Sequence, residues 1–147
     1  MTLLTINTAS NMTLVVDVSI AAKWFIPDER SKAANALLDR VLEDGAYVPA
    51  LFRWEMQNVL LSAERADRID ADDVDAALDS LRDLPIALEP AGERVFSGNE
   101  VRLARHYELT AYDAAYLCLA ASRNIPLATT DAALARAARD LGLVVIP

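Results

Sequence analysis

The chain has 147 residues, one cysteine and a formal net charge of −8 at pH 7, with 54% hydrophobic and 24% charged residues. This length builds one domain around a single core, and the composition excludes a disordered chain. A lone cysteine cannot form an intramolecular disulfide, which is typical of a reducing cytoplasm. No apolar run approaches the roughly 20 residues that span a bilayer, and no signal-peptide pattern opens the chain. We therefore expect a cytoplasmic domain with no membrane partner.

The negative charge is concentrated in one segment. Between residues 64 and 83 eight acids accompany three arginines, so this segment alone supplies −5 of the −8. The rest of the surface is closer to neutral, and its cations are mostly arginine, which binds phosphate through a planar fork. The net charge argues against a partner recruited by a bulk positive field, but it does not exclude nucleic acid.

Short apolar runs alternate with helical patterns along the chain. Residues 1–11 show no period and are expected to form a leader before a domain over residues 12–147. Strands are expected over residues 13–17, 46–49, 86–88, 125–130 and 143–146. Helices are expected over 20–25 (with Ser19 as N-cap), 29–42, 50–65, 70–84, 92–107, the segment around Asp113, and 131–141. This alternation predicts a single-domain, three-layer α/β/α fold with a five-stranded parallel sheet.

The segment from Ala111 to Ala121 is almost wholly apolar but carries one carboxylate, Asp113, near its start. A helix that is apolar on all sides belongs in a core, where an ionised carboxylate is costly unless something pairs with it. Three more acids, Asp17, Glu55 and Asp131, stand at the ends of expected strands or the starts of expected helices. We interpret the four acids as converging on a divalent metal ion.

The expected fold gives this interpretation a physical basis. Open α/β sheets bind ligands outside the carboxyl ends of their strands. Four acids brought to that edge would repel one another and raise one another's pKa unless a cation intervened. An all-oxygen site without His or Cys suits Mg²⁺ or Mn²⁺, with waters completing the coordination. Such an ion can activate water and stabilise charge on a phosphodiester during hydrolysis.

Each acid also has a purely structural explanation. Asp113 fits a capping box with the threonine three positions earlier, and Asp131 fits the N-cap of its own helix. Glu55 fits a solvated helix face, and Asp17 fits a turn residue that bonds the amide two positions later. This alternative requires four independent coincidences, and Asp17 ends an otherwise buried run, so the combined pattern favours a metal site.

Other chemistries have less support. His106 and Cys118, the single histidine and cysteine, are better explained as structural residues, and no glycine-rich phosphate loop occurs. Aromatic residues at positions 24, 25, 52 and 54 could stack on bases, but at helical spacing such residues usually belong to the core. We therefore expect Trp54 to face the core together with Leu60.

Four blocks of sequence carry a resemblance to a known family. The blocks are Val15–Ser19, Trp54–Leu60, Leu109–Leu117 and Leu127–Asp131. In order and spacing they resemble a PIN-domain ribonuclease of the VapC toxin type, from about Met12 to Pro147. The third block is quite specific, whereas the first and last are short. The resemblance implies a five-stranded parallel sheet flanked by helices, and metal-dependent endonucleolytic cleavage of RNA.

The resemblance also implies roles for the four acids. All would be catalytic and would hold Mg²⁺ or Mn²⁺. Asp17 and Asp113 would be the principal metal ligands, often through water. Glu55 would be a ligand or the group that orients the attacking water. Asp131 would be the fourth acid, whose role varies in the family.

Supporting residues and partners follow from the same resemblance. Ser19 and Thr130 match positions that hydrogen-bond around the site. The partners implied are an RNA substrate, a second copy in a homodimer, and a cognate small antitoxin protein that occludes the acidic pocket. We expect the helices over 29–42 and 70–84 to form the dimer or antitoxin surface. The alternatives are a catalytically silent protein-binding module and a metal-dependent phosphatase or DNA nuclease.

Overall fold

The computed structural model describes residues 13–89 and 96–147, and within these ranges five parallel strands form one sheet. The strands are β1 (Leu14–Val16), β2 (Ala46–Val48), β3 (Ile86–Leu88), β4 (Leu127–Ala128) and β5 (Val145–Ile146). Their order across the sheet is β3-β2-β1-β4-β5. The predicted α/β class and the five-stranded parallel sheet are confirmed. The leader predicted over residues 1–11 lies outside the described residues.

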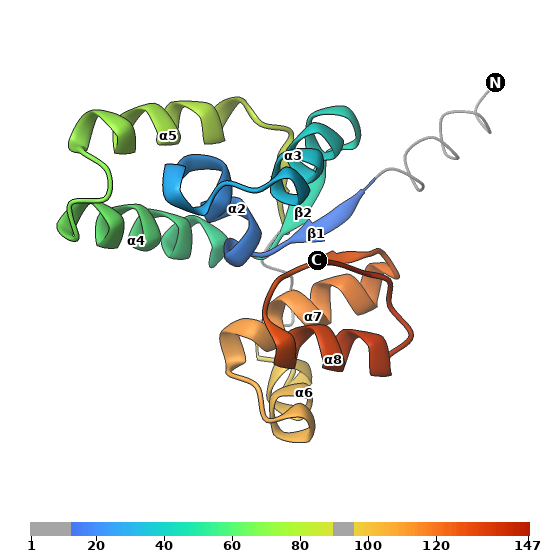
Figure 1. The fold of residues 1–147 in the computed structure, drawn as a ribbon. Helices are drawn as coiled ribbons and strands as arrows, with labels where there is room; N and C mark the ends of the chain where they lie inside the picture. Colours follow the sequence, from blue (N-terminus) through green and yellow to red (C-terminus); the bar gives the residue numbers. More distant parts are fainter. Residues whose placement is uncertain (1–12, 90–95) are drawn as a thin grey trace.

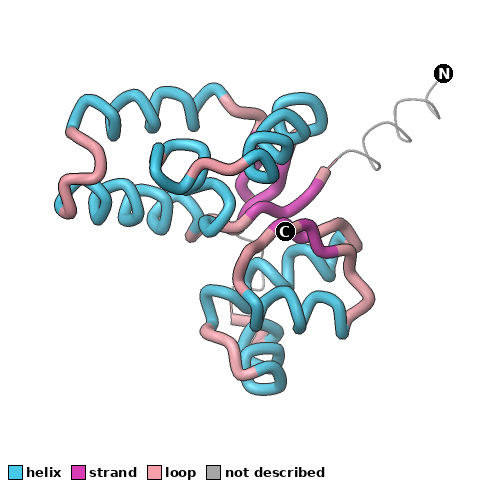
Figure 2. The backbone as a smooth tube through the Cα atoms, viewed as in Figure 1, coloured by secondary structure: helices cyan, strands magenta, loops and turns pink. Residues whose placement is uncertain are grey.

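Helices connect the strands and cover both faces of the sheet. They are α2 (Val18–Phe25), the short 3₁₀ helix η1 (Pro27–Glu29), α3 (Lys32–Asp44), α4 (Phe52–Arg65), α5 (Ala71–Asp83), α6 (Asn99–Tyr107), α7 (Ala111–Arg123) and α8 (Ala132–Asp140). Helices α2 to α5 gather on one side of the sheet and α6 to α8 on the other (Figure 1). The strands lie between these two groups (Figure 2). None of the described helices is long and apolar enough to cross a membrane.

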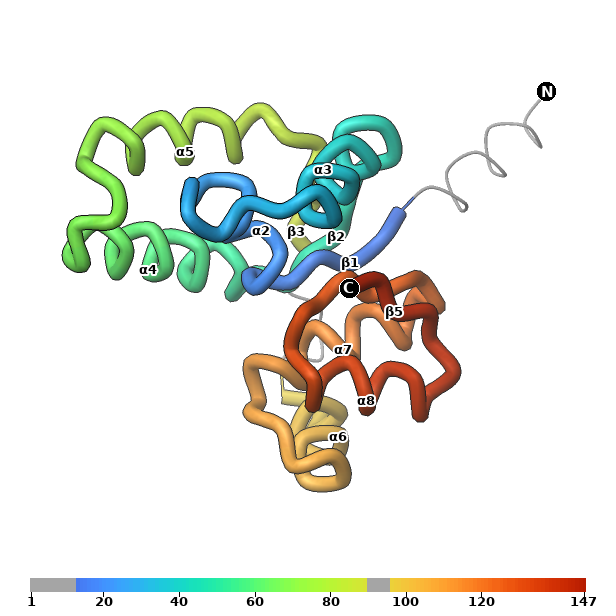
Figure 3. The backbone as a smooth tube through the Cα atoms, viewed as in Figure 1, coloured from blue at the N-terminus to red at the C-terminus, as the bar shows by residue number. Residues whose placement is uncertain are grey.

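The order of the strands creates a switch point between β1 and β4. From β1 the chain winds through β2 to β3, and it then returns to form β4 and β5 on the other side of β1 (Figure 3). Val16 pairs with Ala128 in this register, so Asp17 and Thr129 leave the sheet next to each other. A switch point of this kind is where open α/β sheets bind ligands.

The core is built around the central strand. The three residues of β1 are fully buried, as expected for a strand covered by helices on both faces. The Trp24 indole N–H donates a hydrogen bond to the Ala34 carbonyl oxygen at 2.8 Å, which ties α2 to α3 inside the core. The buried stripe of α4 repeats every three or four residues, as an amphipathic helix requires, and consists of Phe52, Met56, Leu60 and Ala63.

Two local predictions are wrong. The N-cap of α2 is Asp17 rather than Ser19, because Asp17 has extended backbone angles and its carboxylate accepts the Ile20 N–H. Trp54 is 65% exposed rather than packed in the core, since it lies off the buried stripe of α4. The helix expected over 92–107 begins at Asn99, and residues 90–95 lie outside the described ranges.

Leu60 and Leu61 provide a matched test of how α4 packs, because Leu60 is 0% exposed and Leu61 is 38% exposed. We predict that Leu60→Ala lowers the free energy of unfolding by about 2–5 kcal/mol, since it removes buried methyl groups and leaves a cavity. The control Leu61→Ala lowers it by about 1 kcal/mol or less. Urea unfolding followed by circular dichroism measures both values. Equal losses in the two variants would contradict this orientation of α4.

Candidate active site

The four predicted acids all occupy the cap or the first turn of a helix. Asp17 caps α2 and Asp131 caps α8, while Glu55 and Asp113 lie in the first turns of α4 and α7. Helices α2, α4 and α8 each follow a strand, so their N-termini lie at the carboxyl edge of the sheet, and α7 begins there before it runs back to β4. The positive ends of four helix dipoles therefore meet the four carboxylates.

Asp17 is the buried member of the set. One carboxylate oxygen accepts the Ser19 hydroxyl and, at 3.3 Å, the Ile20 N–H, and the other accepts the Thr129 hydroxyl. Burial raises the pKa of Asp17 above its ordinary value, and these hydrogen bonds offset only part of that effect. The side chain is thus held firmly in place although its ionised form is disfavoured.

Glu55 is held by a buried tyrosine. The Tyr116 hydroxyl donates a hydrogen bond to Glu55 Oε1 at 2.6 Å, and the Tyr116 side chain is only 1% exposed. Burial raises the pKa of Glu55, the Tyr116 bond lowers it, and repulsion from Asp113 and Asp17 raises it further. The pKa of Tyr116 is itself raised by burial and by the Glu55 contact, so the hydroxyl remains a donor. Within the described residues the second Glu55 oxygen accepts no hydrogen bond.

Asp113 and Asp131 complete the group from the other side of the sheet. Burial raises the pKa of Asp113, and repulsion from Asp131 adds to the effect. The cap of α7 uses the Asp113 backbone, whose N–H donates to Thr110 Oγ1 at 3.1 Å. Asp131 Oδ1 accepts the Leu134 N–H at 2.8 Å as the N-cap of α8.

The N-cap explanation for Asp131 is therefore correct. Asp17 is also an N-cap, which accepts the Ile20 N–H, rather than a turn residue bonded to the amide two positions later. Both capping roles coexist with a place among the acids.

Mutual repulsion shows that the four acids share one region. Repulsion from Asp17 and Asp113 raises the pKa of Glu55, and repulsion from Asp131 raises the pKa of Asp113. Among residues 13–89 and 96–147 no ion pair includes any of the four. Crowded carboxylates without a cationic partner create a negative potential that favours a bound cation.

The arrangement fits a hydrated ion better than a caged one. Within the described part of the chain, no three His, Cys, Asp or Glu side chains are grouped closely enough to hold a metal ion by themselves. That excludes a closed cage of protein ligands, such as a structural zinc site, in this conformation. Mg²⁺ keeps several waters and binds through one or two carboxylates together with substrate phosphates, and Mn²⁺ has the same preference for oxygen. The oxygen-only donors and their raised pKa values fit such an ion, and the four-ligand set stays a prediction.

The predicted supporting residues both form hydrogen bonds at this edge. The Ser19 hydroxyl donates to Asp17 and accepts the Thr130 N–H at 3.0 Å. Thr130 thus contributes its backbone, whereas its neighbour Thr129 contributes a buried side chain. The Thr129 hydroxyl donates to Asp17 and accepts the Asp131 N–H at 3.0 Å. Thr129 therefore links the two capping acids directly.

Sequence analysis missed two residues of the site, Thr129 and Tyr116. Tyr116 lies three residues after Asp113 on α7, and this spacing could have placed both side chains on one helix face. Thr129 meets Asp17 only because Val16 pairs with Ala128. No pattern in the sequence gives the register between two strands more than 100 residues apart.

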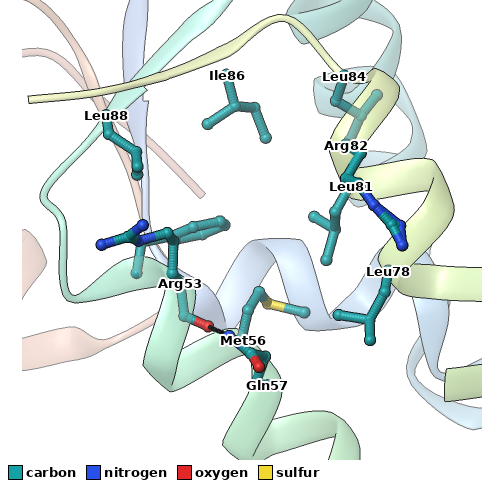
Figure 4. A pocket seen from close by; sticks show the side chains of 10 residues that line it. Arg53, Met56, Gln57, Leu78, Leu81, Arg82, Leu84, Ile86 and Leu88 are labelled. Atoms are coloured by element: carbon teal, nitrogen blue, oxygen red, sulfur yellow. Dashed lines mark hydrogen bonds between the residues drawn. The ribbon is translucent and has the colours of Figure 1, made fainter. Parts of the chain in front are cut away.

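A separate apolar hollow of about 410 Å³ lies between α4, α5 and β3. The side chains of Met56, Leu81 and Ile86 surround it, and those of Arg53 and Arg82 also line it (Figure 4). None of the four acids lines this hollow. It is therefore a distinct surface feature, suited to an apolar partner rather than to a metal ion or phosphate.

The fold and the acids at its switch point define a PIN domain. Residues 14–140 match the PIN domain family, so the chain belongs to that family. It is 31% identical over 124 residues to "Ribonuclease VapC3" of Pyrobaculum aerophilum, covering 84% of this chain and 93% of that protein. The predicted VapC-type membership is thereby confirmed. The crystal structure of PAE2754 from Pyrobaculum aerophilum matches with a TM-score of 0.68 and 22% identity, covering 93% of this chain and 90% of that one, and confirms the fold alone.

We predict that Asp113→Asn raises the melting temperature of EDTA-treated protein at pH 7. Burial and Asp131 raise the pKa of Asp113 in the folded state. The stability that this group contributes is therefore fully present below its unfolded pKa of about 4, and is lost as the pH rises through the folded pKa. The asparagine variant avoids that loss, so its advantage should shrink as the pH falls toward 4.

Differential scanning calorimetry at several pH values measures this difference. Asp39→Asn, on the exposed face of α3, is the matched control and should follow the wild type. A lower melting temperature for Asp113→Asn at every pH would show instead that the carboxylate stabilises the start of α7.

Proposed function

We propose that this protein is a Mg²⁺- or Mn²⁺-dependent endoribonuclease toxin that cleaves RNA phosphodiesters at the carboxyl edge of its sheet. The observation that carries the proposal is the set of carboxylates at the switch point, Asp17, Glu55, Asp113 and Asp131, which form no ion pair within the described residues. Burial raises the pKa of Asp17, Glu55 and Asp113, and repulsion between acids adds to the effect for Glu55 and Asp113. The relative that is named a ribonuclease supports RNA as the substrate. The negative potential explains why a cation must precede a phosphate at this edge.

The side chains support a division of roles. When bound, the ion supplies positive charge that offsets the charge developing on the phosphodiester. We assign the hydrated ion to Asp17 and Asp113. Three hydrogen bonds that fix the Asp17 carboxylate, and the position of Asp113 in the first turn of α7, support this assignment. Glu55 keeps one oxygen on Tyr116, and its other oxygen orients the attacking water and takes up its proton. Asp131 adds negative charge near Asp113 and strengthens the attraction for the cation.

The proposal extends to a cognate small antitoxin in the cytoplasm and to a homodimer. Two apolar surfaces on the α2–α5 side support protein partners. One is the hollow between α4, α5 and β3 (Figure 4). The other lies between α2, α3 and α5 and includes Leu38 and the 55%-exposed Leu42. Helices α3 and α5 correspond to the segments 29–42 and 70–84 that the sequence predicted as the partner surface. An antitoxin seated on this side would have to reach round to the carboxyl edge to occlude the acids.

The first test is cleavage of a mixed pool of structured RNAs with Mg²⁺ or Mn²⁺. We predict cuts at discrete sites with the wild-type protein and with the control Asp39→Asn. EDTA or the substitution Asp17→Asn should each lower the rate by at least about 100-fold, because both remove the bound cation. Cleavage that persists in Asp17→Asn identifies a contaminating ribonuclease. A parallel series with DNA separates an RNA-specific enzyme from a general nuclease.

The second test measures metal binding without catalysis. A ligand that binds only the native state stabilises it by about 2.7 kcal/mol at a hundredfold excess over its dissociation constant. We predict that Mg²⁺ or Mn²⁺ raises the melting temperature of the wild type and of Asp39→Asn, and raises that of Asp113→Asn much less. If the metal leaves the wild type unchanged and no RNA is cut, the catalytically silent binding module becomes the better description.

A further inference from the structure

A groove of about 410 Å³ extends from the acidic site into the space between α2 and α4. The residues that line it are three or four positions apart along each helix, which is the spacing of a single helical face. The α2 wall consists of Val18, Ser19, Ala22, Lys23 and Ile26, and the α4 wall of Asn58, Val59, Ser62 and Ala63. Glu29, Arg68 and Thr130 complete the lining. The floor is apolar and the rim polar, because the buried members of the lining are Ala22, Ile26 and Ala63 and the exposed ones are Asn58, Ser62, Arg68 and Thr130.

One end of the groove is part of the site already described. Ser19 and Thr130 line it, and the Ser19 hydroxyl joins the Asp17 carboxylate to the Thr130 N–H. On α4, Glu55 lies three residues before Asn58, so both occupy the same face of the helix. A substrate strand whose phosphate meets the acids can therefore continue into the groove without leaving the surface.

The opposite end is closed by an ion-pair cluster. Arg68, which follows α4, donates hydrogen bonds to Asp28 at 2.6 Å and to Glu29 at 2.7 Å, both in η1. The Arg68 guanidinium therefore forms ion pairs with both carboxylates, and Glu29 has Arg68 as its partner. Arg68 thus closes the groove but is not available to bind a phosphate.

Lys23 is the cation of this groove that remains uncommitted. It lies four residues, or one helical turn, after Ser19, and no carboxylate of the described residues lies within ion-pair distance of its ammonium. The Asn58 amide and the Ser62 hydroxyl across the groove likewise form no hydrogen bond within the described part of the chain. One ammonium, one amide and one hydroxyl thus line the groove without an ion pair or a side-chain hydrogen bond within the described residues.

We propose that this groove binds the nucleotide next to the scissile phosphate of a single-stranded RNA. Lys23 contacts the phosphate of that nucleotide, Asn58 and Ser62 bond its base edge, and Ala22 and Val59 support its apolar face. An unpaired nucleotide is required because only unstacked bases expose their edges to such side chains. This assignment rests on the proposed ribonuclease function and adds the residues that grip the substrate.

The test compares Lys23→Gln with Lys32→Gln, a matched control at the exposed start of α3 and outside the groove. The substrate is a fluorescent single-stranded oligoribonucleotide. For cleavage with Mn²⁺ we expect Lys23→Gln to raise KM about fivefold with kcat within about twofold, because the lost contact is to bound substrate rather than to the reacting atoms. Lys23→Arg should restore KM. Equal KM values for Lys23→Gln and Lys32→Gln would overturn the assignment.

Binding to the Asp113→Asn protein, measured by fluorescence anisotropy with Mg²⁺, separates the groove from catalysis. Adding Lys23→Gln should weaken binding about fivefold and reduce the slope of log affinity against log salt by about 0.7, the value for one phosphate contact on a single strand. Adding Asn58→Ala should weaken binding without changing that slope. If the wild type cuts no RNA, the proposed function fails, and these affinities still decide the groove. Unchanged affinity, or loss of antitoxin binding alone, overturns it.

Discussion

The hydrogen bond from the Thr129 hydroxyl to the Asp17 carboxylate joins the two halves of the sheet at the point between β1 and β4 where the strand order reverses. The same hydroxyl accepts the Asp131 N–H, so one buried side chain positions the N-caps of both α2 and α8. Without the pairing of β1 with β4 these residues would not meet. The sheet register is therefore the constraint that assembles the acids, and the helices that follow the strands carry them into place.

Three of the four acids lie where the surroundings disfavour the ionised form of the carboxylate. Helix dipoles and hydrogen bonds favour the ionised carboxylates, yet burial outweighs these effects for Asp17, and burial together with repulsion between acids outweighs them for Glu55 and Asp113. A fold selected for stability alone would replace one of them with a neutral residue. Local cost at the carboxyl edge of an otherwise consistent fold is typical of a functional site. The bond from Tyr116 to Glu55 shows how the surrounding core holds such a side chain in one orientation.

The sequence predicted what depends on local pattern, and it failed where tertiary register decides. Apolar runs and helical periods predicted the five strands and the helices, because burial on both faces of a sheet leaves a clear signature. The four acids stood out because each follows a strand or opens a helix, and their role as metal ligands stays a prediction. Thr129 was missed because its partner, Asp17, is 112 residues away. Trp54 was misplaced because several residues of α4 compete for the buried stripe, and pattern alone does not choose between neighbouring phases.

The net charge of −8 is compatible with binding to RNA because the excess is localised. Exposed acids such as Asp72, Asp75 and Asp79 lie on α5, on the opposite side of the sheet from α7 and α8 (Figure 1). Exposed charges act over a screening length of about 8 Å at physiological salt, so the acids of α5 act mainly on their own surroundings. By our proposal the four acids at the carboxyl edge attract a cation, and Lys23 in the adjoining groove forms no ion pair within the described residues. RNA recognition would then depend on a bound ion and a few local contacts, and this arrangement favours discrimination between sites over tight non-specific binding.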